Sequence, residues 1–138
     1  MNKCGQISRE NEEYLQGVYL GSVTEMLPIL LNPTLEIEFA DKVRHLKNIM
    51  EHEKTRKLFR EYSHDKGVIE KIRIPVTKWL LTNNECRNTD VAAEASDIFS
   101  VMYPQLDKIT DKNTLAQLIA GMPEMAMQIL DEYSKLGL

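Results

Sequence analysis

The sequence has 138 residues, of which 43% are hydrophobic and 28% are charged. These values are typical of a globular domain and argue against a disordered chain. Two cysteines are too few for a disulfide framework. The longest apolar stretch, Met26–Leu31, is far shorter than the roughly 20 residues that a membrane span needs. Since the N-terminus also lacks a signal-peptide pattern, we expect a cytoplasmic or nuclear protein that does not enter a membrane.

The net charge of −4 is unevenly distributed. Residues 1–41 and 88–138 each carry a net charge of −5, whereas residues 42–87 carry +6, with twelve basic and six acidic side chains. A basic middle between acidic ends can steer an acidic partner to one surface. The alternative is that the outer helices simply neutralise the inner ones.

The N-terminal third predicts short helices. Residues 1–8 are expected to be frayed, and a short helix through Tyr14–Tyr19 is expected to end at Gly21. Ser22–Glu25 has the spacing of a capping box, which predicts a second helix through Leu30 with Pro28 near its first turn.

The middle of the chain predicts longer helices over residues 34–52, 54–62, 67–81 and 89–103. Asn32 followed by Pro33 is a typical helix start. Pro75 interrupts the third of these helices. It either kinks that helix or divides it in two, with Ile74 displaced from the α region.

Local signals also delimit the C-terminal helices. Asn88 or Thr89 can cap the fourth long helix, which should end before Pro104. Gly121 is expected to end the next helix and Pro123 to begin the last one. The last helix also carries a methionine cluster, which we interpret as core, although a partner-binding surface is the alternative. The cluster consists of Met122, Met125 and Met127.

No strand pattern persists along the chain, and apolar residues instead recur at helical spacing. The sequence therefore predicts one all-α domain over residues 1–138, a compact bundle of about seven or eight helices. The helix lengths are typical of HEAT-like stacked helical pairs, although no strict repeat is visible.

Motifs that carry chemistry are missing from the sequence. His45 and His52 are seven residues apart, whereas metal-binding histidines on a helix usually lie four apart. His64 has no supporting motif, and Cys86 is interpreted as a surface thiol. There is no glycine-rich phosphate loop, paired-carboxylate motif or nucleophile elbow. We therefore expect a protein that is not an enzyme and that uses no cofactor or metal.

Basic side chains around the only tryptophan form the clearest candidate site. A basic rim around a partly exposed tryptophan suits a peptide with an aromatic anchor and acidic flanks. The predicted partner-binding residues are Lys54, Arg56, Arg60, Lys71, Arg73, Lys78 and Trp79.

Three segments between Phe39 and Leu106 carry a resemblance to a known family. They are KVRHL at residues 42–46, GVIEKI at 67–72, and NTDVAAEA at 88–95 followed by Ile98 and Phe99. This part of the chain resembles the helical bundle shared by the N-terminal domain of elongation factor TFIIS, the integrase-binding domain of LEDGF and the core of the Iws/Spn transcription factors. The resemblance implies a nuclear scaffold that binds short motifs of other transcription or chromatin factors.

The leading prediction is thus a non-catalytic α-helical module that binds a short linear or helical segment of a partner protein, in transcription elongation or chromatin. One alternative is a small phage or bacterial helical protein that inhibits or forms part of a nucleoprotein complex. The other is a nucleic-acid-binding domain that uses the basic residues 42–87.

Overall fold

The computed structural model describes residues 22–136, and throughout this range the chain is helix and connecting turns without a strand. The predicted all-α class is thereby confirmed.

The predictions for residues 1–8 and for the helix through Tyr14–Tyr19 lie outside the described residues. A helix covers residues 22–30, and Pro28 lies toward its C-terminal end, so the prediction that Pro28 occupies a first turn is wrong. The remaining elements are α2 (Phe39–Glu51), α3 (Glu53–Glu61), α4 (Lys66–Val68), a π turn (Ile69–Arg73), α5 (Ile74–Leu81), a 3-10 turn (Asn84–Arg87), α6 (Thr89–Met102), a 3-10 turn (Leu106–Lys108), α7 (Lys112–Gly121) and α8 (Pro123–Lys135).

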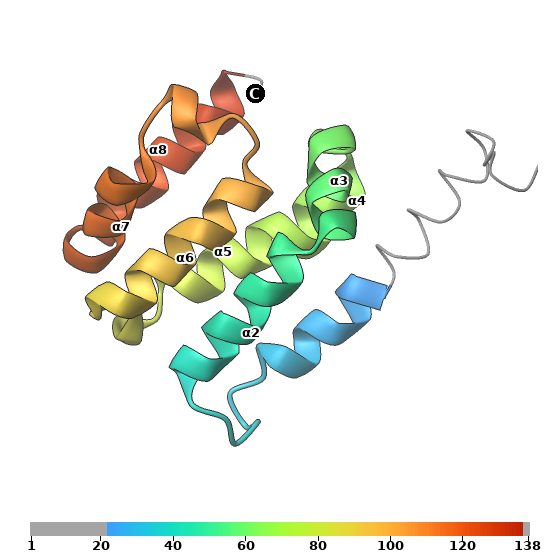
Figure 1. The fold of residues 1–138 in the computed structure, drawn as a ribbon, viewed down its shortest axis with the longest axis vertical. Helices are drawn as coiled ribbons and strands as arrows, with labels where there is room; N and C mark the ends of the chain where they lie inside the picture. Colours follow the sequence, from blue (N-terminus) through green and yellow to red (C-terminus); the bar gives the residue numbers. More distant parts are fainter. Residues whose placement is uncertain (1–21, 137–138) are drawn as a thin grey trace, which may run out of the picture.

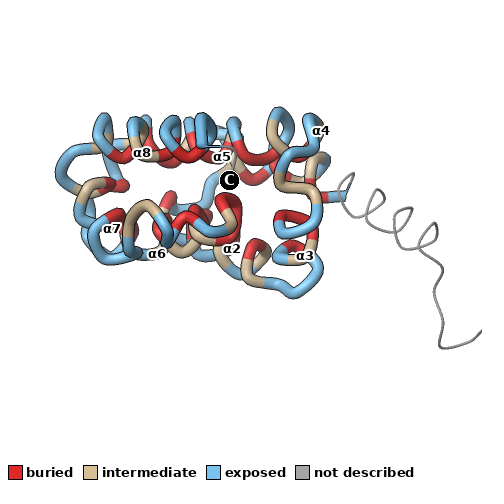
Figure 2. The backbone as a smooth tube through the Cα atoms, turned by 90° about the horizontal axis from the view of Figure 1, so that it is seen from above, coloured by how far each residue is buried: buried red, intermediate tan, exposed pale blue. Residues whose placement is uncertain are grey.

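The helices form two layers. α6 packs between α2 and α7, and α5 contacts α8 from the other side of the core. Figure 1 shows α2 and α6 running side by side, and Figure 2 shows α4, α5 and α8 in one row above α2, α3, α6 and α7. The buried residues of the two rows face each other and form one apolar cluster that extends from Val23 to Tyr133. This arrangement leaves the loop before α2 and the end of α5 at the surface of the bundle.

Most predicted boundaries after residue 52 lie close to the observed ones because local capping groups set them. The Asn88 side chain accepts hydrogen bonds from the backbone N–H groups of Asp90 and Val91, so α6 begins where predicted. α6 ends before Pro104, α7 ends at Gly121, and Pro123 is the first residue of α8.

The predicted helix start at Asn32 is wrong. The Asn32 Oδ1 atom accepts hydrogen bonds from the backbone N–H and the hydroxyl of Thr34, at 3.0 and 2.8 Å. The side chain therefore closes a local turn instead of capping a helix, a competition that is common for asparagine. As a result α2 begins only at Phe39, and residues 31–38 form an irregular loop.

Pro75 lies within one continuous helical segment that contains a π turn. The Ile74 N–H donates to the Ile69 carbonyl, five residues earlier. A regular α-helix would bring the Pro75 ring against the Lys71 carbonyl, and a wider turn relieves that clash. Ile74 keeps helical angles (φ −64°, ψ −50°), so the prediction that it leaves the α region is wrong.

Two further sequence predictions concern burial: the one for Cys86 is wrong, and the one for the methionine cluster is wrong for two of its three residues. Cys86 is 2% exposed because the 3-10 turn folds it inward, so it is not a surface thiol. Met122 and Met125 are 49% and 45% exposed, so these two methionines are not core residues. Met127 is half-buried against the core.

Asp97 on α6 joins three helices through ion pairs. Its carboxylate lies 3.2 Å from the Lys47 Nζ of α2 and 2.6 Å from the Lys112 Nζ of α7. Burial alone would raise the pKa of Asp97, but the hydrogen bonds from Lys112 and Lys47 outweigh it and hold the pKa below its usual value. The hydrogen bond to Asp97 likewise raises the pKa of Lys47.

We expect Asp97→Asn to lower the free energy of unfolding by about 1 kcal/mol at pH 7, because two partly exposed ion pairs are lost. Since the folded-state pKa of Asp97 is depressed, its contribution is present above the unfolded-state pKa and is lost as the pH falls through the folded-state value. The difference between variant and wild type should therefore shrink below about pH 4. Urea unfolding at several pH values measures it. Asp107→Asn, which removes an exposed carboxylate, is the control; an equal loss in both variants would contradict the prediction.

Candidate functional site

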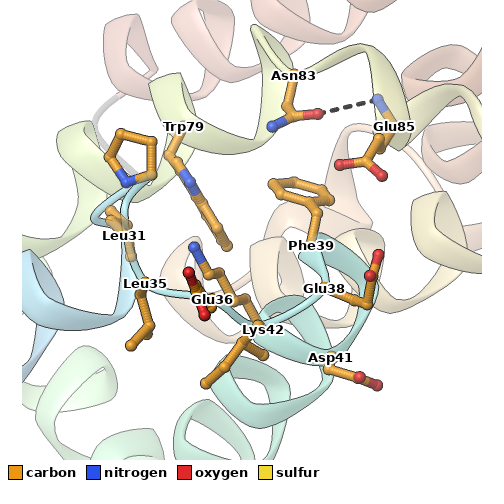
Figure 3. Close-up of a pocket in the computed structure, with 12 residues that line it drawn as sticks. Leu31, Leu35, Glu36, Glu38, Phe39, Asp41, Lys42, Trp79, Asn83 and Glu85 are labelled. Atoms are coloured by element: carbon orange, nitrogen blue, oxygen red, sulfur yellow. Dashed lines mark hydrogen bonds between the residues drawn. The ribbon is translucent and has the colours of Figure 1, made fainter.

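A pocket lies where the loop before α2 meets the end of α5 (Figure 3). Its volume is about 870 Å³. Because its walls come from two segments that are distant in sequence, the pocket exists only in the folded chain. We call it the Trp79 pocket, and it is lined by Leu31, Pro33, Leu35, Glu36, Ile37, Glu38, Phe39, Asp41, Lys42, Trp79, Asn83 and Glu85.

Two aromatic rings form the apolar part of the pocket. The ring centroids of Phe39 and Trp79 are 4.8 Å apart and the rings are tilted by 49°. Phe39 is buried, whereas Trp79 is only half-buried and so presents part of its indole to the pocket. Leu35 and the 47% exposed Ile37 extend this apolar surface along the loop. An aromatic floor beside exposed aliphatic side chains is a surface that can take up an apolar side chain.

Lys42 fixes the shape of the loop. Its Nζ donates a 2.9 Å hydrogen bond to the Asn32 carbonyl, although the side chain is buried. The Asn32 carbonyl also accepts from the Leu35 N–H, and the Leu35 carbonyl accepts from the Ile37 N–H. α2 thus holds the loop by a side chain near its first turn, which presets the wall that carries Leu35 and Ile37.

Carboxylates surround the apolar surface of the pocket, and they belong to Glu36, Glu38, Asp41 and Glu85. Asp41 lies 3.9 Å from the exposed Arg44 guanidinium. Among the described residues no ion pair involves the other three, and the only cation in the lining is Lys42. The Asn83 side chain accepts from the Glu85 N–H at 2.9 Å, which positions Glu85 on its 3-10 turn. The pocket is therefore negatively charged around an aromatic floor.

The seven predicted site residues do not form one surface. Trp79 lines the pocket described above, but none of the six predicted cations does. Arg56 and Arg60 of α3 instead line a smaller pocket of about 450 Å³, which we call the arginine pocket, together with Ser100, Val101, Pro104 and Gln105. Lys54, Lys71 and Lys78 are exposed.

Both arginines of that smaller pocket already have acidic partners. The Arg60 Nη2 atom lies 3.1 Å from the Glu53 carboxylate. The Arg56 Nε donates to the Glu51 carbonyl at 2.9 Å, and its Nη2 lies 4.0 Å from the Glu51 carboxylate. Part of the basic charge that the sequence shows is thus compensated within the same region of the chain.

Arg73 is only 6% exposed, so its assignment to a basic surface is wrong. Its guanidinium carbon lies 4.8 and 5.6 Å from the ring centroids of Tyr103 and Tyr133. The Nη1 atom donates to the Ser63 carbonyl at 3.3 Å. Burial raises the pKa of both tyrosines, and this effect outweighs the lowering by the Arg73 charge. Arg73 therefore stabilises the fold through cation–π contacts between α8, the end of α6 and the π turn.

Sequence reasoning missed the acidic side of the pocket, although a signal was present. Residues 35–39 read Leu-Glu-Ile-Glu-Phe, in which apolar and acidic residues alternate. In an extended backbone, alternation of this kind places apolar and charged side chains on opposite sides. In the structure this segment supplies Leu35, Ile37 and Phe39 to the apolar surface and Glu36 and Glu38 to its acidic surroundings.

The described residues contain no helix with the length and hydropathy of a membrane span, and no group of three or more histidine, cysteine, aspartate or glutamate side chains that could hold a metal ion. Comparison with protein-family models, with curated proteins and with solved structures finds no match to this chain.

Proposed function

We propose that this chain is a non-catalytic α-helical interaction module that binds a short linear segment of a partner protein in the Trp79 pocket. The observation that carries this proposal is a preshaped pocket with a half-buried tryptophan at its floor. Tryptophan is among the residues that contribute most to binding energy at protein interfaces. The Lys42 hydrogen bond holds the wall in place before binding, which reduces the entropy lost on association.

The proposed setting is transcription elongation or chromatin, in the cytoplasm or nucleus. Its support is the sequence resemblance of three segments, which form part of α2, α4 with the π turn, and α6. These elements belong to the same helical core, with α2 packed directly against α6. The nucleic-acid alternative gains no support from the Trp79 pocket, because its carboxylates would repel phosphate.

Selection of random peptides displayed on phage tests the proposed function. Synthetic copies of the selected peptides can be titrated without a label, because the only tryptophan of the chain lies in the pocket and its fluorescence reports occupancy. We expect Ile37→Ser to weaken binding about ten-fold, since the variant removes an exposed apolar wall of the pocket.

Ile74→Ser is the matched control, because Ile74 is 42% exposed and does not line the pocket. It should leave the affinity unchanged. Equal losses in the two variants, or a selection that yields no peptide able to change Trp79 fluorescence, would contradict the proposed function.

A further inference from the structure

We infer that the Trp79 pocket selects a partner segment in which lysine or arginine side chains flank the apolar anchor. This inference rests on the proposed function and adds the chemistry of the partner. It reverses the charge that the sequence alone suggests, because the tryptophan lies among acidic side chains rather than basic ones.

Negative charge predominates around the pocket. Four carboxylates and one ammonium line it, and the ammonium of Lys42 is buried and bound to a carbonyl. Glu36, Glu38 and Glu85 have no ion-pair partner among the described residues. Like charges gathered around an open surface repel one another, and a cationic partner relieves that repulsion.

Several basic side chains elsewhere in the molecule, in contrast, are already bound or buried. Arg56 and Arg60 already pair with Glu51 and Glu53, and Arg73 is buried between two tyrosines. An acidic partner at the arginine pocket would therefore have to compete with existing ion pairs, whereas a basic partner that contacts Glu36, Glu38 and Glu85 would not. Charge complementarity thus favours the basic segment.

The aromatic floor of the pocket also favours a cationic partner. Trp79 is half-buried and packs at a tilt against Phe39. The π-system of an indole attracts a cation as well as an apolar group. A segment with an aliphatic or aromatic residue between arginines or lysines can fill the apolar surface and place its cations against both the indole and the carboxylates. The same pocket therefore supplies the anchor site and the charge selection.

Three synthetic peptide pools test this inference. Each pool has random apolar residues at its central positions, and the flanks are lysine and arginine, serine and glutamine, or glutamate and aspartate. We expect the basic pool to bind wild-type protein about ten-fold more tightly than the neutral pool, as measured by Trp79 fluorescence at low salt. This preference should fall as salt is added.

The variant Glu36→Gln/Glu38→Gln/Glu85→Gln should reduce the affinity for the basic pool to that for the neutral pool. The control Glu124→Gln/Asp131→Asn/Glu132→Gln changes the net charge equally with exposed residues of α8 and should keep the preference. Equal loss in both triple variants would overturn the inference, because it would show that net charge alone acts.

The remaining outcomes separate this inference from the proposed function. Equal binding of basic and neutral pools, or tightest binding of the acidic pool, would overturn the charge selection and leave the proposed function intact. If none of the three peptide pools bound, the result would contradict both the charge selection and the proposed function. A fluorescence change that depends on protein concentration without peptide would assign the pocket to a second copy of the chain and would also overturn the inference.

Discussion

Replacement of Arg73 by glutamate should lower the free energy of unfolding by about 4 kcal/mol, because it places a buried carboxylate where two tyrosine rings hold a cation. The electron-rich ring faces that attract the guanidinium repel the carboxylate. The hydrogen bond to the Ser63 carbonyl is lost as well, since a carboxylate cannot donate one. Urea unfolding followed by circular dichroism measures the change.

Two further variants isolate the cause of this effect. Lys71→Glu makes the same charge change two residues away on an exposed side chain, and it should shift the free energy of unfolding by no more than about 0.5 kcal/mol. Arg73→Met keeps the apolar part of the side chain and should lower the free energy of unfolding by about 2 kcal/mol. This loss lies between those expected for Arg73→Glu and Lys71→Glu. If Arg73→Glu were as stable as Lys71→Glu, the burial of Arg73 would be contradicted.

The Cys86 thiol should react with a disulfide reagent at pH 8 about a thousand-fold more slowly in the folded protein than in urea. Burial, with a smaller contribution from the Glu85 charge, raises the pKa of Cys86 from 9.0 to about 12. The reactive thiolate is correspondingly rarer in the folded state. The Cys4→Ser variant leaves Cys86 as the only thiol, so absorbance of the released reagent reports it alone.

The same pKa shift has a consequence for stability. The folded state holds the Cys86 proton more tightly than the unfolded state does. The contribution of this thiol to the free energy of unfolding is therefore fully present below the unfolded-state pKa of about 9, and it is lost as the pH rises toward 12. Reaction of Cys86 in the folded protein at the rate measured in urea would contradict both expectations and restore the original interpretation of a surface thiol.

The sequence was sufficient to predict a helix end where the residue that sets it acts on the backbone of its own turn. Asn88 caps α6, and Pro123 begins α8, because each residue acts on backbone groups within its own turn. Asn32 carries the same cap signal, but its side chain binds the neighbouring Thr34 instead. Sequence alone does not separate these two local outcomes, since both satisfy the asparagine oxygen.

The surroundings of the candidate site residues depend on contacts with residues that are far away in the sequence, which the sequence alone does not show. Arg73 is buried because Tyr103 and Tyr133, far along the chain, come together around it. Trp79 lies among carboxylates because the loop at residues 31–38 packs beside the end of α5. The basic stretch identified in the sequence was real, but only the fold decides which of its members reach the surface and which pocket the tryptophan joins.

The π turn at Ile69–Arg73 also affects how this chain can be compared with other helical proteins. A π turn holds one residue more than an α turn, and each residue of an α-helix corresponds to a rotation of about 100°. Val68 and Leu80 lie on opposite sides of the turn, and both are buried. In an uninterrupted α-helix these two residues would lie about 120° apart around the axis, whereas one extra residue brings them to about 20°. A gap-free alignment to an uninterrupted helix would therefore assign the wrong face to every position on one side of the turn. The correct alignment places a one-residue insertion within residues 69–73.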